Sequence, residues 1–210
     1  MFVRVYKCSF LVNKHKNVNM RSYIKSTNQY LLMYKVVCAD APWEYRSKHI
    51  GGSMTSGSAQ KYSTMSLEEI CRMDVKDIMD PSGSILFLWA TTPLLPEAFR
   101  VMSSWGYTYK TSIFWDKMSY GMGYWFRGQI EVCLVGIHGK VKAFRHQKPN
   151  FIQSKVRAHS QKPEEFWELI NPALDAHGLS PRIELFCRGE PRTGWDGWGS
   201  ECPTSQNINL

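Results

Sequence analysis

The pattern of apolar and polar positions alternates along residues 34–187 between two kinds of segment. Short, largely apolar runs bounded by turn residues predict buried strands, because such runs are too short for helices. They lie at residues 36–40, 84–90, 107–115, 130–137 and 182–187. The intervening segments carry the signals of helices, so strands and helices alternate along the chain.

Two of these helices have clear ends. Ser66 and Glu69 have the spacing of a capping box, which predicts a helix from there to about residue 73. A second helix is predicted over residues 95–105, where Gly106 follows as a residue that tolerates the left-handed conformation of a helix C-terminus.

The third helix is predicted to begin at Pro163, since proline suits a first turn and the two acids after it favour the positive end of the helix dipole. Alternation of strands and helices indicates an α/β sandwich with a mostly parallel sheet. Ligands bind such sheets at the carboxyl ends of the strands. Asp40 and Arg188 follow two of the predicted strands, so both belong to that edge.

The net charge of +8 is unevenly distributed. Residues 1–35 and residues 138–163 each contain seven Lys or Arg and no acid, while the remainder is mildly acidic. Clustered Lys and Arg gain by displacing counterions from phosphates, which favours a nucleic-acid partner. The alternative is an ordinary solvated surface.

Several classes of protein are disfavoured. No apolar run has the length of a membrane-spanning helix, and residues 1–18 do not resemble a signal peptide. The six cysteines form no C-x-x-C pair, so we expect reduced thiols in a cytoplasmic protein and no metal. The sequence also lacks a P-loop, a G-x-G-x-x-G and a G-x-S-x-G motif, which removes support for phosphoryl transfer and for α/β-hydrolase chemistry.

Eight sequence blocks occur in an order that resembles the DPPW-type adenine methyltransferases, the family of the eukaryotic mRNA adenosine methyltransferase and its bacterial and phage relatives. They are ADAPW (39–43), YSTMS (62–66), LFLWAT (86–91), WGYTYKTSIFWDK (105–117), EVCLVG (131–136), HSQKPEEF (159–166), IELFCR (183–188) and GWDGWGSE (194–201). The resemblance covers residues 34–201. It implies a Rossmann-like sheet in permuted motif order with one antiparallel hairpin, and S-adenosyl-L-methionine as cofactor.

The resemblance divides the chain into a basic extension over residues 1–33, a methyltransferase domain over residues 34–203 and a C-terminal tail over residues 204–210. Its D-x-P-W motif assigns catalysis to Asp40, Ala41, Pro42 and Trp43. Asp40 and the Pro42 carbonyl would accept the two N–H groups of the adenine amine, and Trp43 would stack on the base. Ala41 stands where the family usually has proline, which leaves the loop freer. Read in isolation, Asp40 would cap a turn and Trp43 would be core.

Further residues are assigned by the same resemblance. Lys162 matches a lysine beside the catalytic centre, where it would pair with the cofactor carboxylate or hold the acids in place; alone, it would be an exposed lysine before a helix. The cofactor would be contacted by Asp40, Ala41, Lys162, Glu184, Phe186, Arg188, Gly199, Ser200 and Glu201. A plain ion pair between Glu184 and Arg188 is the alternative for those two. Ser200-Glu201 replaces the asparagine usual after this glycine.

The substrate side would be formed by aromatic, acidic and basic residues. The resemblance places Tyr62 on a loop after D-x-P-W and Glu131 beside the acceptor pocket, and Trp125 and Arg127 would line the nucleic-acid side. The basic stretch adds Lys140, Lys142, Arg145, Lys155 and Arg157. Trp89, Trp105 and Trp115 lie in strand or helix blocks and are expected in the core.

The function predicted from these observations is S-adenosylmethionine-dependent methylation of the 6-amino group of adenine, in DNA rather than RNA because the chain is compact and shows no added RNA-binding domain. The alternatives are RNA adenine or cytosine 4-amino methylation, and a non-catalytic nucleic-acid-binding partner subunit. We expect a monomer or homodimer, or a heterodimer with a paralogue, located in the cytoplasm and associated with the nucleoid in a bacterium or phage.

Overall fold

The computed structural model describes residues 33–44, 64–121, 125–145, 148–157 and 161–210. The basic N-terminal segment, most of the predicted loop after D-x-P-W and the predicted substrate residue Tyr62 lie outside these residues. The predicted structure between Tyr34 and the C-terminus can therefore be compared with the molecule, apart from these gaps.

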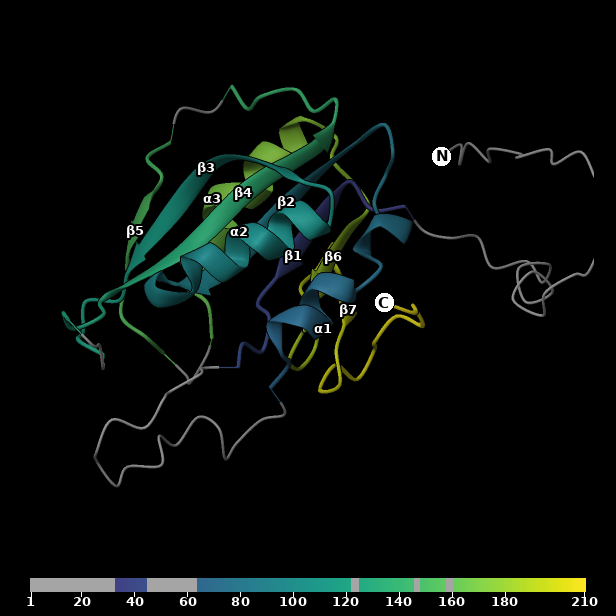
Figure 1. Ribbon diagram of the computed structural model, residues 1–210. Coiled ribbons are helices and arrows are strands. Elements are labelled where there is room, and N and C mark those ends of the chain that lie inside the picture. Colours follow the sequence, from purple (N-terminus) through teal and green to yellow (C-terminus); the bar gives the residue numbers. More distant parts are fainter. Residues whose placement is uncertain (1–32, 45–63, 122–124, 146–147, 158–160) are drawn as a thin grey trace, which may run out of the picture. The chain divides into compact units, whose positions relative to one another are not determined.

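One sheet organises the described residues, and seven strands compose it in the order β5-β3-β4-β2-β1-β6-β7 (Figure 1). β4 runs antiparallel to β2 and β3, and the other neighbours pair in parallel. This is the predicted mostly parallel sheet with an antiparallel hairpin. The strands are β1 (Val36–Ala39), β2 (Gly83–Thr91), β3 (Thr108–Asp116), β4 (Ile130–Gly139), β5 (Phe151–Gln153), β6 (Arg182–Leu185) and β7 (Asp196–Trp198).

Helices cover both faces of the sheet. Figure 1 shows α1 (Leu67–Arg72) and α2 (Leu95–Ser104) on one side and α3 (Glu164–Ala176) on the other. Two short 3-10 turns, Val75–Asp77 and Thr92–Leu94, complete the helical elements of the described residues. All three α-helices were predicted from the sequence, and their predicted boundaries agree within a few residues.

Alternating side chains of each strand feed two separate cores, because successive residues of a strand point to opposite faces. Val37 and Ala39 of β1 pack with α1 and α2. Val36 and Cys38 pack with Phe166 and the rest of the α3 side. Burial on both faces explains why the central strands are unbroken apolar runs.

The helix-ending signals have the expected geometry. The Ser66 hydroxyl accepts a hydrogen bond from the Glu69 amide, and the Glu69 carboxylate accepts one from the Ser66 amide, which completes the capping box of α1. Gly106 follows α2 with a φ of 80°, a conformation that residues with a Cβ rarely adopt.

Two strands were missed by the sequence analysis. β5 and β7 have three residues each, and neither contains an apolar run long enough to stand out. Each of them forms by hydrogen bonding to a neighbouring strand as an outer strand of the sheet, β5 beside β3 and β7 beside β6. This long-range pairing leaves no local pattern in the sequence.

Candidate active site

A cluster of two carboxylates and two lysines lies at the carboxyl edge of the sheet. Asp40 follows β1, and Glu131 opens β4 at the same edge because its antiparallel partners there are Thr91 and Trp115, at the ends of β2 and β3. Lys162, just before α3, joins the two acids: its Nζ lies 2.8 Å from Asp40 Oδ2 and 3.2 Å from Glu131 Oε2.

Lys117 completes the cluster from the other side of Glu131. Its Nζ lies 3.3 Å from Glu131 Oε1, so the two lysines hold the two oxygens of one carboxylate. The Lys162 ammonium also lies 5.4 Å from the centre of the Trp89 ring, within the range of a cation–π contact. These contacts are those required for Lys162 to hold the acids in place, and its pairing with the cofactor carboxylate stays a prediction.

The cluster perturbs the acidity of its members in different directions. Burial raises the pKa of Asp40, and the Lys162 ammonium opposes that rise. Burial would also raise the pKa of Glu131, but Lys162 and Lys117 outweigh it and the pKa is lowered. Burial would lower the pKa of Lys162, yet the attraction of Asp40 and Glu131 raises it. The same ammonium therefore stabilises the ionised form of both acids.

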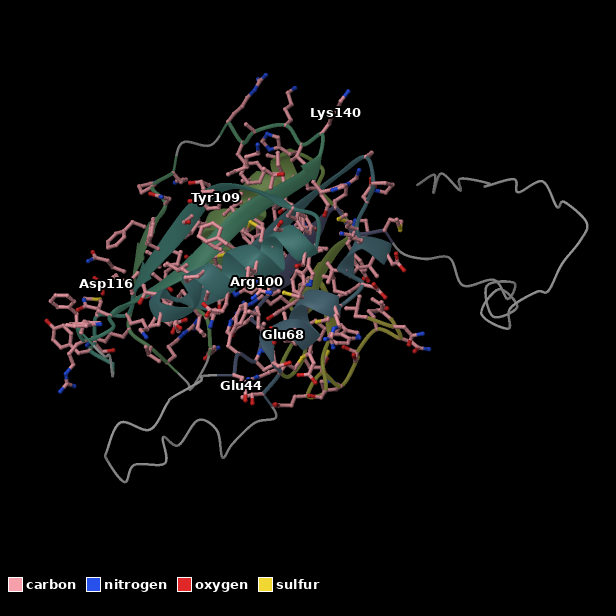
Figure 2. All side chains as sticks on the ribbon, viewed as in Figure 1. Glu44, Glu68, Arg100, Tyr109, Asp116 and Lys140 are labelled. Atoms are coloured by element: carbon pink, nitrogen blue, oxygen red, sulfur yellow. The ribbon has the colours of Figure 1, made fainter. Side chains whose placement is uncertain are left out.

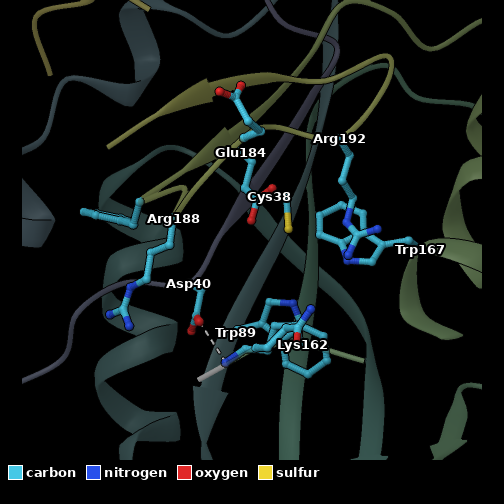
Figure 3. Close-up of a pocket in the computed structure, with 11 residues that line it drawn as sticks. Cys38, Asp40, Trp89, Lys162, Trp167, Glu184, Arg188 and Arg192 are labelled. Carbon is cyan, nitrogen blue, oxygen red and sulfur yellow. Dashed lines mark ion pairs between the residues drawn. The ribbon is translucent and has the colours of Figure 1, made fainter. Parts of the chain in front are cut away.

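Beside this cluster opens a cavity of about 420 Å³, a size usual for small-molecule sites. Figure 3 shows the ion pair between Asp40 and Lys162 at one end and Glu184, Arg192 and Trp167 toward the other. Its walls combine acids, bases and aromatic rings, contributed by Cys38, Asp40, Trp89, Gln161, Lys162, Trp167, Glu184, Phe186, Arg188, Glu190 and Arg192.

Two polar groups on the wall of this cavity are poorly compensated within the described residues. The Trp89 Nε1 is buried there without a hydrogen-bond acceptor. Burial raises the pKa of Glu184 to about 6, an effect that Arg192 only partly offsets. A buried donor and a mostly buried carboxylate of this kind are suited to a polar ligand, because leaving such groups unsatisfied costs stability.

A second cavity of about 210 Å³ shares Phe186 and Arg188 with the first. Gly199, Ser200 and Glu201 line it after β7. A Cβ on Gly199 would meet the carbonyl oxygen of Cys187 at 2.5 Å, so only glycine allows this close approach. The remaining lining residues are Pro42, Met65, Cys187 and Trp198. Most of the residues expected to hold the cofactor thus line two adjoining cavities.

Arg188 forms an ion pair with Glu201, whereas the alternative considered from the sequence was an ion pair with Glu184. Its Nε lies 4.0 Å from Glu201 Oε1, and the two residues form an isolated parallel bridge. Phe186 has a φ of 61°, unusual for a residue with a side chain, at the turn between β6 and Arg188. The segment after β6 therefore turns between the two cavities and directs Arg188 toward the segment after β7.

The backbone of the D-A-P-W loop is fixed by hydrogen bonds. The Pro42 carbonyl accepts the Met65 amide at 2.8 Å, and the Ala41 carbonyl accepts the Trp43 amide at 2.9 Å. Trp43 is only 8% exposed, and its Nε1 donates to the Trp89 carbonyl at 3.2 Å. A carbonyl has two lone pairs, so Pro42 can accept a further hydrogen bond. Stacking of a base on Trp43 stays a prediction.

The basic stretch is divided between the carboxyl edge of the sheet, where the parallel strands end, and the opposite edge, where they begin. Lys140, Lys142 and Arg145 follow β4, which runs antiparallel, so the structure does not bring them to the cluster. Lys140 directly follows Gly139, which is paired with Gly83 at the start of β2. At the usual rise of a strand, Gly83 is roughly 25 Å from Thr91 at the other end of β2. Figure 2 shows Lys140 and Asp116 at opposite ends of the sheet.

Lys155 and Arg157 follow β5, which is parallel to β3, and therefore lie at the edge that carries Asp116 and the cluster. Arg157 is paired with Glu164 at 3.2 Å. Trp125 and Arg127 are exposed on the loop between β3 and β4, at the same edge. These four predicted substrate residues thus share the edge of the candidate site.

Sequence reasoning missed several residues of the site: Lys117, Gln161, Trp167, Glu190 and Arg192. Lys117 could have been predicted from the sequence. A hairpin of the predicted strands 107–115 and 130–137 places the end of the first strand opposite Glu131. Arg192 had no local signal. Its guanidinium pairs with both oxygens of Glu164 and lies 4.8 Å from the centre of the Trp167 ring, contacts that only the fold creates.

No group of three or more His, Cys, Asp or Glu with the geometry of a metal site occurs among the described residues. In the same part of the chain, no helix is both long and apolar enough to span a membrane. Trp105 and Trp115 are buried, as expected for core residues, whereas Trp89 is buried and also lines the larger cavity.

Comparison with known proteins gives consistent relatives. The chain is 34% identical over 193 residues to the type II methyltransferase M.MunI of Mycoplasma sp., covering 82% of this chain and 79% of that protein. It is 28% identical over 177 residues to the human N(6)-adenosine-methyltransferase catalytic subunit METTL3, covering 79% of this chain and 27% of that protein.

A Medicago truncatula protein, named a putative N(6)-adenosine-methyltransferase MT-A70-like, is 27% identical and covers 80% of this chain. The chain spans only about a quarter of the length of these plant and animal relatives. The MT-A70 family model matches residues 34–201, a span that contains all eight sequence blocks. The chain therefore belongs to the MT-A70 family of methyltransferases, as its motifs predicted.

Proposed function

We propose that this protein transfers a methyl group from S-adenosyl-L-methionine to the exocyclic 6-amino group of adenine in nucleic acid. The observation that carries the proposal is the position of Asp40. Its carboxylate lies at the carboxyl edge of the sheet, on the wall of the larger cavity, and Lys162 fixes it at 2.8 Å.

The residues of the two cavities fit this cofactor chemically. S-adenosylmethionine supplies an electrophilic methyl group on a cationic sulfur, together with an amino-acid end and an adenosine. Lys162, Arg188 and Arg192 can receive a carboxylate, and Glu184 can accept hydrogen bonds from an ammonium or from hydroxyls. Rings of Trp89, Trp167 and Phe186 offer apolar surface among these charges.

Asp40 would act directly on the acceptor amine. The amine of adenine is a poor nucleophile because its lone pair is delocalised into the ring. A hydrogen bond from an amine N–H to Asp40, and another to the Pro42 carbonyl, would localise that lone pair on nitrogen. Burial raises the pKa of Asp40, so the same carboxylate can take the proton that the amine gives up as the new carbon–nitrogen bond forms.

Lys162 would keep Asp40 ionised and oriented. Without it, Asp40 and Glu131 would be two carboxylates close together, of which one would hold a proton. Lys117 supports the arrangement by pairing with the second oxygen of Glu131. The chain thus supplies positioning and electrostatics, which suffice for an in-line transfer with no covalent enzyme intermediate.

DNA is the substrate that we propose over RNA. The type II methyltransferase and this chain cover about four fifths of each other, whereas the adenosine methyltransferases are several times longer than the part they share with it.

The test is direct identification of the product. Purified protein is incubated with methyl-labelled S-adenosylmethionine and, in separate reactions, duplex DNA, single-stranded DNA and RNA, and the nucleosides are then separated. Label in N6-methyldeoxyadenosine supports the proposal. Label only in N6-methyladenosine would move the substrate to RNA, and label only in a methylated cytosine would refute adenine as the acceptor.

A further inference from the structure

The loop between β3 and β4 exposes an unusual amount of apolar surface. Trp125 is 93% exposed and Phe126 89%, and Tyr120 and Met118 add 76% and 54%. We refer to these four described residues as the hairpin patch. Large apolar side chains so open to water are costly unless a partner covers them, and they mark a binding surface.

The base of this loop is firmly held, so the patch is presented from a fixed platform. Asp116 accepts hydrogen bonds from the Met118 amide and from the side-chain amides of Gln129 and Gln153. Backbone hydrogen bonds from Lys117 to Gln129 and from Gly121 to Gly128 continue the pairing of the two strands beyond the sheet.

The platform projects from the candidate active site itself. Glu131, whose carboxylate is held by Lys162, lies at the start of β4, and Gly128 precedes it by three residues. At the rise of a strand, the distance from Glu131 to Gly128 is about 10 Å. Trp125 lies in the same loop, three residues before Gly128. The hairpin patch therefore lies near enough to the cluster to contact the same nucleic-acid segment as the acceptor adenine.

Charge favours nucleic acid as the occupant rather than another protein. The segment 117–128 contains Lys117 and Arg127 and no acid. Arg127 is exposed beside Phe126, and exposed Lys155 lies at the same edge of the sheet. Aromatic rings interleaved with positive charge suit stacked bases and phosphates.

We propose that Trp125 and Phe126 insert into duplex DNA beside the target adenine and occupy the space that the base leaves when it enters the active site. This inference rests on the proposed function. An adenine within a duplex cannot reach Asp40 while it is stacked and paired, and its extrusion costs free energy. Aromatic or apolar side chains that stack in the vacated step offset part of that cost.

The proposal is tested by comparing duplex and single-stranded substrates of identical sequence. The variant is Trp125→Ala/Phe126→Ala, in which two exposed side chains are removed and the core is untouched. The control is Phe99→Ala/Tyr109→Ala, an exposed aromatic pair with ring centres 5.1 Å apart, in which Tyr109 lies toward the opposite end of β3.

The hairpin variant is expected to methylate duplex oligonucleotides at least about 10-fold more slowly than the wild type, with a clearly smaller loss on single strands, which need no extrusion of the base. A duplex carrying 2-aminopurine at the methylated position should also lose its rise in fluorescence on binding. The control variant should behave as the wild type in both assays.

Three results would overturn the inference. Equal losses of methylation rate on duplex and single-stranded substrates would show that the two aromatic residues contact nucleic acid without a role in base extrusion. Unchanged rates on both substrates would show no contact with nucleic acid. A loss that coincides with conversion of a dimer to a monomer in light scattering would assign the surface to a second copy of the chain. If the wild type methylates no adenine at all, the proposed function itself fails, an outcome distinct from these three.

Discussion

At the scale of single residues, Lys162 joins the groups that form the site. It contacts Asp40, Glu131 and the face of Trp89, which come from three different strands or strand ends. One ammonium thus fixes the relative positions of the groups that we propose around the acceptor. Its removal should change chemistry more than substrate binding.

Lys162→Gln should shift the pH dependence of methylation. In the proposed mechanism transfer requires ionised Asp40, and Lys162 lowers the pKa of that acid against the effect of burial. Without the ammonium the pKa rises further, so activity is lost at a higher pH on acidification, by about one pH unit. The kcat/KM profile between pH 5 and 9 measures this. Lys117→Gln removes a partner of Glu131 but none of Asp40, so the pH at which this variant loses activity on acidification should stay as in the wild type. Equal shifts in both variants would contradict the role assigned to Lys162.

Glu184→Gln should separate stability from cofactor binding. The folded pKa of Glu184 is about 6 against an ordinary 4.5, so its ionisation above pH 6 disfavours the fold. At pH 8 the glutamine variant should be more stable by up to about 2 kcal/mol, and the gain should vanish below pH 4.5.

Urea unfolding at both pH values, with calorimetry of S-adenosylmethionine binding at pH 8, measures the two effects. The same variant should bind the cofactor more weakly. Glu168→Gln, on the exposed side of α3, serves as control. A gain that persists undiminished well below pH 4.5 would rule out this carboxylate as its source.

At the scale of elements, the segment after β7 connects the core to the smaller cavity. The Gly199 amide donates to the Ser205 hydroxyl at 3.1 Å, and the Trp198 Nε1 donates to the Ile208 carbonyl at 3.1 Å. Ile208 and Leu210 pack against the core on the α1 side of the sheet. Residues 204–210 therefore contact the segment expected to hold the cofactor.

Ser205→Ala should weaken cofactor binding about fivefold, the worth of one hydrogen bond that holds Gly199 in place, with little effect on thermal stability. Ser103→Ala is the control, because this serine is exposed on α2 and lines neither cavity. Calorimetric titration with S-adenosylmethionine distinguishes the two variants. Equal affinities for both would show that the tail does not support the site.

Elements with strong local signals could be predicted from sequence, and those created by pairing could not. The capping box of α1, the glycine after α2 and the apolar runs of β1 and β2 each carry their own pattern. β5 and β7 exist through long-range contacts with β3 and β6. For the same reason the basic stretch resembles one surface in the sequence: only the antiparallel direction of β4 shows that Lys140 and Lys155 lie at opposite edges.

The motifs supplied the individual residues of the site, and the fold supplied their arrangement. The sequence blocks contain Asp40, Glu131 and Lys162, and the resemblance left open whether the lysine pairs with the cofactor or holds the acids; its position between the two carboxylates comes from the fold. The burial of Trp43 agrees with the alternative in which this residue belongs to the core, but its contacts with Met65 and Trp89 from other segments depend on the fold.

At the scale of the whole molecule, charge should act mainly where it faces the substrate. Lys155→Glu/Arg157→Glu alters the edge of the site, whereas Lys140→Glu/Lys142→Glu makes the same change in charge at the opposite edge. The first pair should weaken DNA binding and lower the slope of log K against log salt by about one for each phosphate that the variant no longer neutralises. The second should have a clearly smaller effect. Fluorescence anisotropy over a salt range of about 50 to 300 mM compares them, and equal effects would show that only net charge matters.

The central claim is that Asp40 performs the chemistry on an adenine amine. Asp40→Asn keeps the size of the side chain and removes its charge, so S-adenosylmethionine should still bind within a few-fold of the wild type by calorimetry, while labelled methyl transfer to adenine falls by at least about 100-fold. Glu44→Gln, an exposed carboxylate four residues later, is the control and should transfer normally. Formation of N6-methyladenine at the wild-type rate by the Asp40→Asn protein would contradict the account.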